Sequence, residues 1–329
     1  MDFQKPRVTI NEIAELAGVS IATVSRALNN RPGISQKTKE KVQRIITQTG
    51  YQPNIFARNI REHQTKLIGL IISDASNEFF KQVSRAVQDQ AALAGYSVIM
   101  LNSDENPAEE MQAIQILRHY DVSGLIIAST DTHLDYHQLV GDTPTVFFDR
   151  APSPDKQSQF DTLLVNNVSG AELAVSELIR QGASKIGILS SGVSTAGKER
   201  QQGYLKALAE YHLPLDQNLI YTSDVKQIKA LDYAHELLMT HHCDGIFAAD
   251  NTLLLVVLQE IKLLHRPNIK VATFDNTAWF DYFKQPVISV KQPTATIGHQ
   301  AVDLVLKRIK EPTLPAKTRR FSVQLIRRG

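Results

Sequence analysis

The sequence predicts an α/β protein with a small helical head, a short linker and a core of two doubly wound parallel sheets. Three short amphipathic patterns occupy the first 52 residues, and a glycine turn separates the first two. From Lys66 onward, short apolar runs alternate with helical patterns, which is typical of parallel sheets covered by helices. The 329 residues therefore divide into a head at 1–52, a linker at 53–65 and a core at 66–329.

The composition is that of a globular protein of a reducing compartment. Apolar residues make up 43% and charged residues 21%, and apolar runs such as 253–258 are far shorter than the ~20 residues that a membrane-spanning helix needs. The N-terminus lacks the apolar region of a secretory signal. The single cysteine, Cys243, excludes an intramolecular disulfide. We therefore expect a cytoplasmic protein.

Charge is distributed unevenly along the chain. Residues 1–66 hold eleven Lys/Arg and five Asp/Glu, whereas the remaining residues hold 25 basic and 29 acidic groups. A basic head on a mildly acidic body favours a polyanionic partner for the head.

The head has the pattern of three short helices. Thr9 and Glu12 have the spacing of a capping box, and the apolar residues of 10–17 repeat at helical spacing. Gly18 ends this first helix, because glycine tolerates the left-handed backbone of a helix C-terminus. A second helix is expected at about 20–29, and a third follows it. This is the arrangement of a helix-turn-helix, whose second helix enters the major groove of DNA.

The outward face of the second helix carries side chains suited to DNA. Hydroxyl groups suit phosphates, Arg26 can donate to O6 and N7 of guanine, and Ile21 and Ala22 can contact thymine methyl groups. The alternative is a three-helix module for protein contact with a solvated Arg26. The candidate DNA-binding residues of the head are Thr9, Ser20, Ile21, Ala22, Thr23, Ser25, Arg26 and Asn29.

Two longer stretches resemble a known family. The run VTINEIAELAGVSIATVSRALNN at 8–30 and the run GYQPNIFARNI at 50–60 are similar to the signature of the LacI/GalR family of regulators. The resemblance implies a dimeric transcription regulator with a DNA-binding head, a hinge helix and a sugar-sensing core of periplasmic-binding-protein type.

The resemblance also implies that residues 53–61 form a hinge helix over the minor groove of the operator. So short a helix is marginal alone, which fits folding when two copies pack together on DNA. A leucine of the family wedges into the central base step, and Ile60 stands there in this chain, apolar but stiffer at χ1. An ordinary linker is the alternative. The candidate DNA-binding residues of the hinge are Asn54, Ala57, Arg58 and Ile60.

Within the core, the pattern predicts two halves with a ligand-binding cleft between them. Ligands of such sheets bind beyond the carboxyl ends of the strands. Strands are expected at 67–72, 97–101, 124–128, 145–148, 185–189, 245–248 and 270–274. Helices are expected near 79–94, 107–119, 169–182, 198–211, 227–241 and 252–264. The two subdomains are expected at about 66–163 with 294–318, and at 164–293 with 319–329.

Polar and aromatic residues recur at these strand ends. Carboxylate and guanidinium groups bond to sugar hydroxyls, and aromatic rings cover the apolar C–H face of a sugar. The runs SNEFFKQV, LNSDENPAEEMQ and FFDR are similar to the ribose-binding branch of the fold and imply effector contacts. Together these arguments give the candidate effector-binding residues Asp74, Asn77, Phe79, Phe80, Asp149, Arg150, Arg200, Asp250, Asp275 and Lys291.

The chain departs from the family pattern at several positions near these candidates. Asp250 and Asn251 reverse the usual order, whereas Glu78 and Val225 stand where proline and an aromatic residue are common. The departures leave the identity of the sugar open.

One run matches a phosphate-binding loop over its first seven positions, from Gly192 to Lys198. The eighth position holds Glu199 rather than the Ser or Thr that would ligate magnesium, and its carboxylate would repel phosphates. We interpret the run as a cleft loop that leads to Arg200. Two histidine-containing clusters are better explained by structural or solvated roles than by metal binding. We predict no metal and no cofactor, and we interpret the basic C-terminus as a solvated tail.

Together these features predict a repressor of carbohydrate uptake or catabolism genes, and not an enzyme. Its partners are expected to be double-stranded, pseudo-palindromic operator DNA, a small sugar or sugar phosphate, and a second copy of the chain, with no membrane. The chain shows no heptad pattern after the core, which favours a dimer formed through the core; by resemblance, residues 80–94 contribute to it. The alternatives are a global catabolite regulator driven by a phosphoprotein, a sugar-processing enzyme with a DNA-binding head, and a nucleotide hydrolase.

Overall fold

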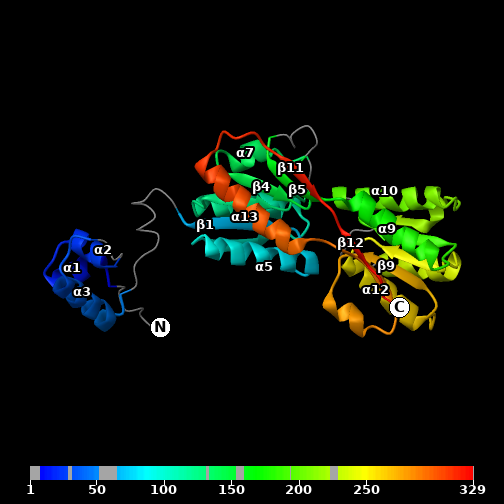
Figure 1. Cartoon of the computed structure of the whole chain (residues 1–329), viewed down its shortest axis with the longest axis horizontal. Helices are drawn as coiled ribbons and strands as arrows, with labels where there is room; N and C mark the ends of the chain where they lie inside the picture. The colour runs from blue at the N-terminus through cyan, green and yellow to red at the C-terminus, as the bar shows by residue number, and fades with distance from the viewer. Residues whose placement is uncertain are drawn as a thin grey trace. The chain divides into compact units, whose positions relative to one another are not determined.

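The computed structural model contains two compact units, one that ends at Thr65 and one that begins at Lys66 (Figure 1). It describes residues 8–28, 32–51, 65–130, 133–152, 159–192, 194–222 and 229–328. Outside the described residues lie Val225, the predicted hinge helix and the DNA-contact candidates Asn29, Asn54, Ala57, Arg58 and Ile60.

The first unit is a three-helix head, in which the first helix begins and ends where the sequence predicts and the third begins after Ser35 as predicted. The helices are α1 (Ile10–Ala17), α2 (Ile21–Leu28) and α3 (Gln36–Thr49). The capping box is confirmed, because the backbone N–H of Thr9 donates to Glu12 (2.6 Å) and that of Glu12 donates to the Thr9 hydroxyl (3.4 Å). Gly18 adopts the left-handed backbone, with φ 61°. The fully buried residues Ile13, Ala17, Val24 and Val42 form the centre of the small core.

The second unit contains two six-stranded sheets, and the first has the strand order β11-β5-β4-β3-β1-β2, all parallel. Helices α5 and α13 cover one face of this sheet and share one apolar cluster with it. Helices α6 and α7 cover the other face and share a second cluster. The strands are β1 (Leu67–Ile72), β2 (Ser97–Asn102), β3 (Gly124–Ile127), β4 (Thr145–Phe148), β5 (Asp161–Val165) and β11 (Thr318–Phe321). The helices are α5 (Glu78–Leu93), α6 (Pro107–His119), α7 (Tyr136–Val140) and α13 (Thr294–Lys310).

The second sheet repeats this plan with the order β12-β10-β9-β8-β6-β7, in which only β12 among the described strands is antiparallel. Helices α9 and α10 pack on one face, and α11 and α12 pack on the other. The strands are β6 (Ile186–Ser190), β7 (Ile220–Thr222), β8 (Gly245–Ala248), β9 (Lys270–Phe274), β10 (Val287–Lys291) and β12 (Gln324–Ile326). The helices are α9 (Asn167–Arg180), α10 (Thr195–Glu210), α11 (Lys229–His235) with a π-helical turn η2 (Glu236–Thr240), α12 (Asn251–Leu263), and the short η1 (Gln217–Leu219) and η3 (Ala278–Tyr282).

Within the described core, the chain crosses between the two sheets after β5, after β10 and after β11. The predicted subdomain boundaries at 163 and 318 fall two or three residues too early. Strand β5 stays in the first sheet through Val165, because its residues pair with those of β11 through Phe321.

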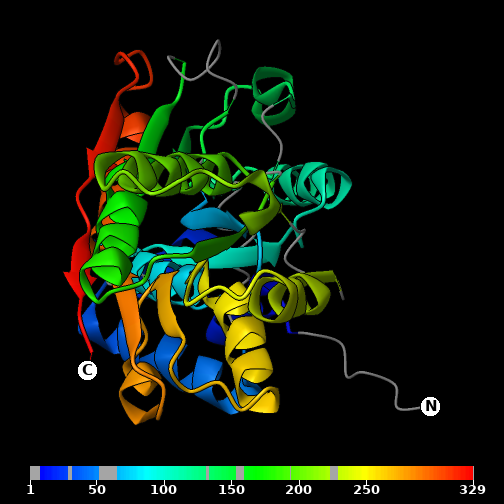
Figure 2. The same ribbon diagram turned by 90° about the vertical axis from the view of Figure 1, so that its right-hand side faces the viewer.

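The C-terminus is part of the fold, so its interpretation as a solvated tail is wrong. Strand β11 forms one edge of the first sheet and β12 one edge of the second, and Figure 2 shows this red segment passing along both. Arg328 donates to Asp281 (2.6 Å) and to the hydroxyl of Ser289 (2.8 Å). These bonds hold the last described residues against the second subdomain.

Candidate functional site

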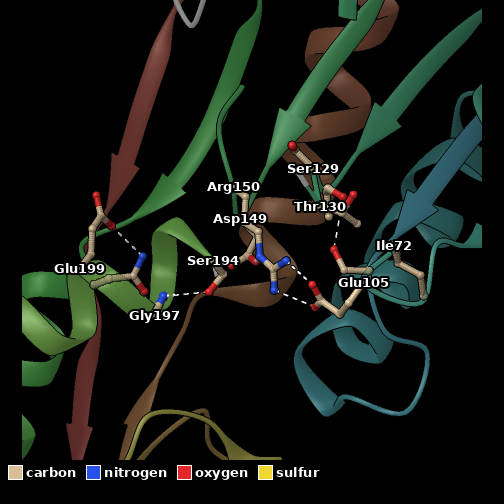
Figure 3. Close-up of polar contacts among 12 residues, drawn as sticks. Ile72, Glu105, Ser129, Thr130, Asp149, Arg150, Ser194, Gly197 and Glu199 are labelled. Atoms are coloured by element: carbon tan, nitrogen blue, oxygen red, sulfur yellow. Dashed lines mark hydrogen bonds and ion pairs between the residues drawn. The ribbon is translucent and has the colours of Figure 1, made fainter. Parts of the chain in front are cut away.

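A cleft lies between the two subdomains, at the carboxyl ends of strands from both sheets. Figure 3 shows side chains of the first subdomain at the end of β4 facing the start of α10 in the second. The cleft is lined by Asp74, Asn77, Phe79, Phe80, Glu105, Asp149, Arg150, Ser191, Ser194, Ala196, Gly197, Arg200, Ala249, Asp250, Asp275 and Gln292. The structure therefore brings together every predicted effector residue except Lys291.

Lys291 lies in a neighbouring hollow instead, together with Glu78 and Asp281. It is the last residue of β10, where side chains alternate between the two faces of the strand. Val290 is buried and Lys291 is exposed, so the next side chain on the buried face is that of Gln292. Gln292 is the residue that lines the cleft.

Two arginines reach the cleft, Arg200 buried and Arg150 half-buried, and both are held by protein groups. Arg150 donates from both terminal nitrogens to the carboxylate of Glu105, at 2.5 and 2.8 Å (Figure 3). Arg200 donates to the side chain of Asn167 (3.0 Å) and to the carbonyl oxygen of Ala249 (2.7 Å). Its guanidinium carbon also lies 3.9 Å from the ring centroid of Phe274, a distance typical of a cation–π contact.

Three buried aspartates line the cleft at the ends of β4, β8 and β9. Asp149 and Asp275 adopt left-handed backbone, with φ 63° and 71°, where each strand turns. Asp250 caps α12 by accepting from the backbone N–H groups of Thr252 (2.9 Å) and Leu253 (2.8 Å). Burial raises the pKa of Asp149 and of Asp250. Burial also raises the pKa of Asp275 to about 6, against the attraction of the nearby Arg200 charge.

Aromatic rings form the apolar part of the cleft. Asn77 caps α5 by accepting from the backbone N–H of Phe79 (2.9 Å), which fixes the start of the helix at the cleft. The rings of Phe79 and Phe80 are 5.2 Å apart and pack against Phe148 beneath them. The cleft therefore combines an apolar wall with hydrogen-bonding groups, as sites for polyhydroxylated ligands do.

Sequence reasoning missed several lining residues, chiefly Glu105, Ser194 and Gln292. Glu105 follows β2, whose carboxyl end lies at the same edge of the sheet as that of β1, so its position along the chain carried a usable signal. Ser194 caps α10 by accepting from the backbone N–H of Gly197 (2.9 Å). A Cβ on Gly197 would lie 2.1 Å from the carbonyl oxygen of Ser191, which explains a glycine there.

The phosphate-loop-like run serves the packing of the core. Glu199 accepts from the side chain of Asn167 (2.9 Å) and from Arg320 (2.8 Å), so its carboxylate is bound by protein groups. Across the part of the chain that the structure describes, no group of three or more His, Cys, Asp and Glu side chains could hold a metal ion.

The head presents the predicted DNA face on α2. Ile21, Ala22 and Arg26 are exposed, whereas Thr23 and Ser25 are half-buried and Val24 lies in the core. Ser20 directly precedes the helix, and its hydroxyl accepts from the backbone N–H of Thr23 (3.2 Å). Thr9 is exposed but is engaged in the capping box of α1.

A helix-turn-helix head joined to a two-sheet core with an interdomain cleft defines the class of ligand-responsive DNA-binding regulators. Residues 9–54 match the model of bacterial regulatory proteins of the lacI family, and residues 65–327 match that of periplasmic binding proteins and the sugar-binding domain of the LacI family. The chain belongs to the LacI family of transcriptional regulators.

Curated relatives align along almost the whole chain. A sucrose operon repressor of Pediococcus pentosaceus is 32% identical over 327 residues, covering 95% of this chain and 98% of the relative. The HTH-type transcriptional repressor PurR of Vibrio atlanticus (strain LGP32) is 30% identical over 311 residues, covering 92% of each. These relatives are regulators, which sets aside the hydrolase and sugar-processing alternatives.

Solved structures share the fold. The lac repressor dimer bound to operator and the anti-inducer ONPF superposes with a TM-score of 0.83 at 23% identity over 98% of both chains. A complex of the transcriptional regulator CelR with cellobiose gives a TM-score of 0.73 at 24% identity, over 97% of this chain and 98% of the other.

Among the described residues, no helix has the length and apolar character needed to cross a membrane.

Proposed function

We propose that this regulator is a homodimeric repressor of carbohydrate uptake or catabolism genes, that it acts on operator DNA in the bacterial cytoplasm, and that a small sugar or sugar phosphate in the cleft controls it. The observation that carries the proposal is the convergence of Asp149, Asp250, Asp275 and two arginines with the ring of Phe79 at one interdomain cleft. Carboxylates accept from sugar hydroxyls, guanidinium groups donate to them, and the ring covers an apolar face. The named specificity of the sucrose operon repressor supports the same ligand class.

The DNA half of the proposal rests on α2. Arg26 and the exposed apolar side chains of Ile21 and Ala22 share the outer face of this helix. In the major groove, Arg26 would donate to guanine and the two apolar side chains would contact thymine methyl groups. Two heads of a dimer would read half-sites one helical turn apart, which requires a pseudo-palindromic operator.

The dimer half of the proposal is supported by exposed apolar side chains on the first subdomain. Leu93 at the end of α5 is 85% exposed, and Met100 on the edge strand β2 and Tyr120 after α6 are each more than 40% exposed. Large exposed apolar side chains on adjacent elements are typical of protein interfaces. Residues 80–94, which are predicted to contribute to the dimer interface, make up most of α5.

Control by a ligand requires two states of the core that the ligand distinguishes. Because operator and ligand bind different units, a ligand changes operator affinity only through a difference in its affinity for the two core states. The cleft lies between subdomains that three crossings connect, so closure of the cleft is the natural difference between the states.

The test is thermal unfolding of the full chain with pentoses, hexoses, disaccharides and their phosphates, followed by operator binding measured by fluorescence anisotropy with and without each hit. A ligand at a hundred times its dissociation constant stabilises the folded state by ~2.7 kcal/mol, which raises the melting temperature measurably. A hit that also changes operator affinity supports the proposal. Operator binding without any hit would contradict sugar control and favour a phosphoprotein coregulator.

A further inference from the structure

The ion pair between Glu105 and Arg150 occupies the cleft itself. Arg150 follows β4 and Glu105 follows β2, so both belong to the first subdomain and meet without any contribution from the second. The carboxylate accepts from both terminal nitrogens of the guanidinium, at 2.5 and 2.8 Å, which is the two-pronged geometry that an anionic ligand would use. Burial alone lowers the pKa of Arg150, but the Glu105 carboxylate raises it above its ordinary value.

The turn that carries Glu105 is built to hold it in this position. Asp104 and Glu105 both adopt left-handed backbone, with φ 57° and 58°, a conformation that costs free energy for residues other than glycine. Hydrogen bonds compensate this cost: the backbone N–H of Glu105 donates to the carbonyl oxygen of Ser73 (2.9 Å), and that of Asn106 donates to Ser103 (2.9 Å). The carboxylate therefore reaches Arg150 from a supported turn.

The charge around Arg150 also disfavours an anion. The lining carries the carboxyl groups of Asp74, Glu105, Asp149, Asp250 and Asp275 against the two guanidinium groups of Arg150 and Arg200. The second guanidinium already donates to protein acceptors. With Glu105 in place, a phosphate or carboxylate would have to displace a carboxylate from Arg150 inside a cleft rich in acidic groups.

We propose that Glu105 is a specificity-determining residue that excludes anionic effectors, so that the cleft takes an uncharged polyhydroxylated ligand and rejects its phosphate esters. This proposal rests on the effector site described above and selects between the two ligand classes left open there. A neutral ligand leaves the ion pair intact, because its hydroxyl groups donate to the outer lone pairs of Glu105. An anion must break the pair.

The experiment compares the full-length wild type with Glu105→Gln, which keeps the size of the side chain and removes its charge. Glu105→Asn is the second variant, because asparagine tolerates left-handed backbone. The probe is inorganic phosphate, followed by pairs of a neutral sugar and its phosphate ester, at matched ionic strength with chloride as reference. The matched control is Glu109→Gln, an exposed carboxylate on α6 that is absent from the cleft lining.

We expect phosphate to leave the melting temperature of the wild type unchanged and to raise that of both Glu105 variants. The gain should correspond to an affinity for phosphate at least about tenfold higher, as one strong charge-assisted pair supplies. The gain should disappear in the double variant Glu105→Gln/Arg150→Gln, and the control should behave as the wild type does.

Three outcomes would overturn the role of Glu105: wild-type protein that binds phosphate esters as tightly as the neutral parents, Glu105 variants that gain no phosphate binding, or a gain that survives loss of Arg150. The second and third outcomes do not depend on knowing the effector, because inorganic phosphate is their probe. Failure of the proposed function shows differently, as operator binding that no sugar changes.

Discussion

Replacing Asp275 with asparagine should stabilise the core at neutral pH, because the folded protein buries this carboxylate at a cost. Asp275 is 5% exposed at the end of β9, and burial raises its pKa from the usual 3.8 to about 6. Burial is the largest effect on this pKa; the charge of Arg200 and the bond from Gln292 lower it, and the charges of Asp250 and Asp149 raise it. Asparagine keeps the oxygen that accepts from the side chain of Gln292, so the substitution removes the charge and retains the acceptor.

The magnitude follows from the two pKa values. A group whose pKa is higher in the folded state lowers stability as pH rises, and the full penalty is present above the folded pKa. A difference of about two pKa units corresponds to ~3 kcal/mol above pH 7, and about half of that remains at pH 5. The substitution Asp275→Asn should therefore raise the free energy of unfolding by up to ~3 kcal/mol at pH 7.5 and by about half as much at pH 5.

The assay is urea denaturation of the core at both pH values, with Asp142→Asn as the matched control. Asp142 is an exposed aspartate in a turn of the same core, so its substitution should change the free energy of unfolding little at either pH. A stabilisation that is equal at pH 7.5 and pH 5, or a loss of stability that is greater at pH 7.5, would show that the burial of Asp275 does not carry the penalty described here.

Three further substitutions test the head and the cleft. Arg26→Ala should weaken specific operator binding by ~1–3 kcal/mol, and equal loss on cognate and scrambled DNA would remove its role in base readout. Ile13→Ala should destabilise the small head core by ~2–5 kcal/mol and abolish operator binding, while the melting temperature of the effector-binding core stays constant because it is a compact unit with apolar clusters of its own. Arg150→Gln should abolish the effector response with operator binding retained; a normal response, read as operator affinity with and without the effector, would mean that Arg150 does not contact the effector.

Much of the fold could be predicted because the sequence signals are local and strong. The capping box at Thr9 and the glycine at Gly18 mark helix ends by backbone chemistry alone. Strands such as β1 and β8 are uninterrupted apolar runs, because both faces are covered by helices. Sequence patterns therefore locate these elements without knowledge of the strands and helices that pack against them.

Two missed strands, β5 (DTLLV) and β10 (VISVK), are buried and largely apolar, so a local pattern was present and was overlooked. The other missed strands depend on partners that local patterns do not reveal. Strand β11 has the sequence TRRF, and its first three residues are exposed, because it forms the edge of a sheet and gains its hydrogen bonds from β5. Strand β12 likewise forms an edge, and β7 is only three residues long. Polar edge strands carry no apolar run, so the basic C-terminus looked like a solvated tail.

Residues of the candidate site also differ in how well the local sequence predicts them. Strand-end aspartates such as Asp149 and Asp275 were predictable, because the carboxyl ends of parallel strands share one edge of a sheet. Glu105 was harder to find because it reaches the cleft through two consecutive left-handed residues, and a sequence of ordinary residues gives little sign of that backbone. Whether Lys291 or Gln292 lines the cleft depends on which face of β10 each side chain occupies, and this is set by the register of the strand.

Glu199 shows how a misleading motif is resolved by its contacts. Its carboxylate joins Arg320 on β11 to Asn167 at the start of α9, and Asn167 in turn accepts from Arg200 in the cleft. These four side chains connect the cleft wall of the second subdomain to an edge strand of the first, close to two of the crossings between them. A Ser or Thr at position 199 would be too short and uncharged to pair with this arginine. The residue that disqualifies the run as a phosphate loop is thus one that bonds across the boundary between the subdomains.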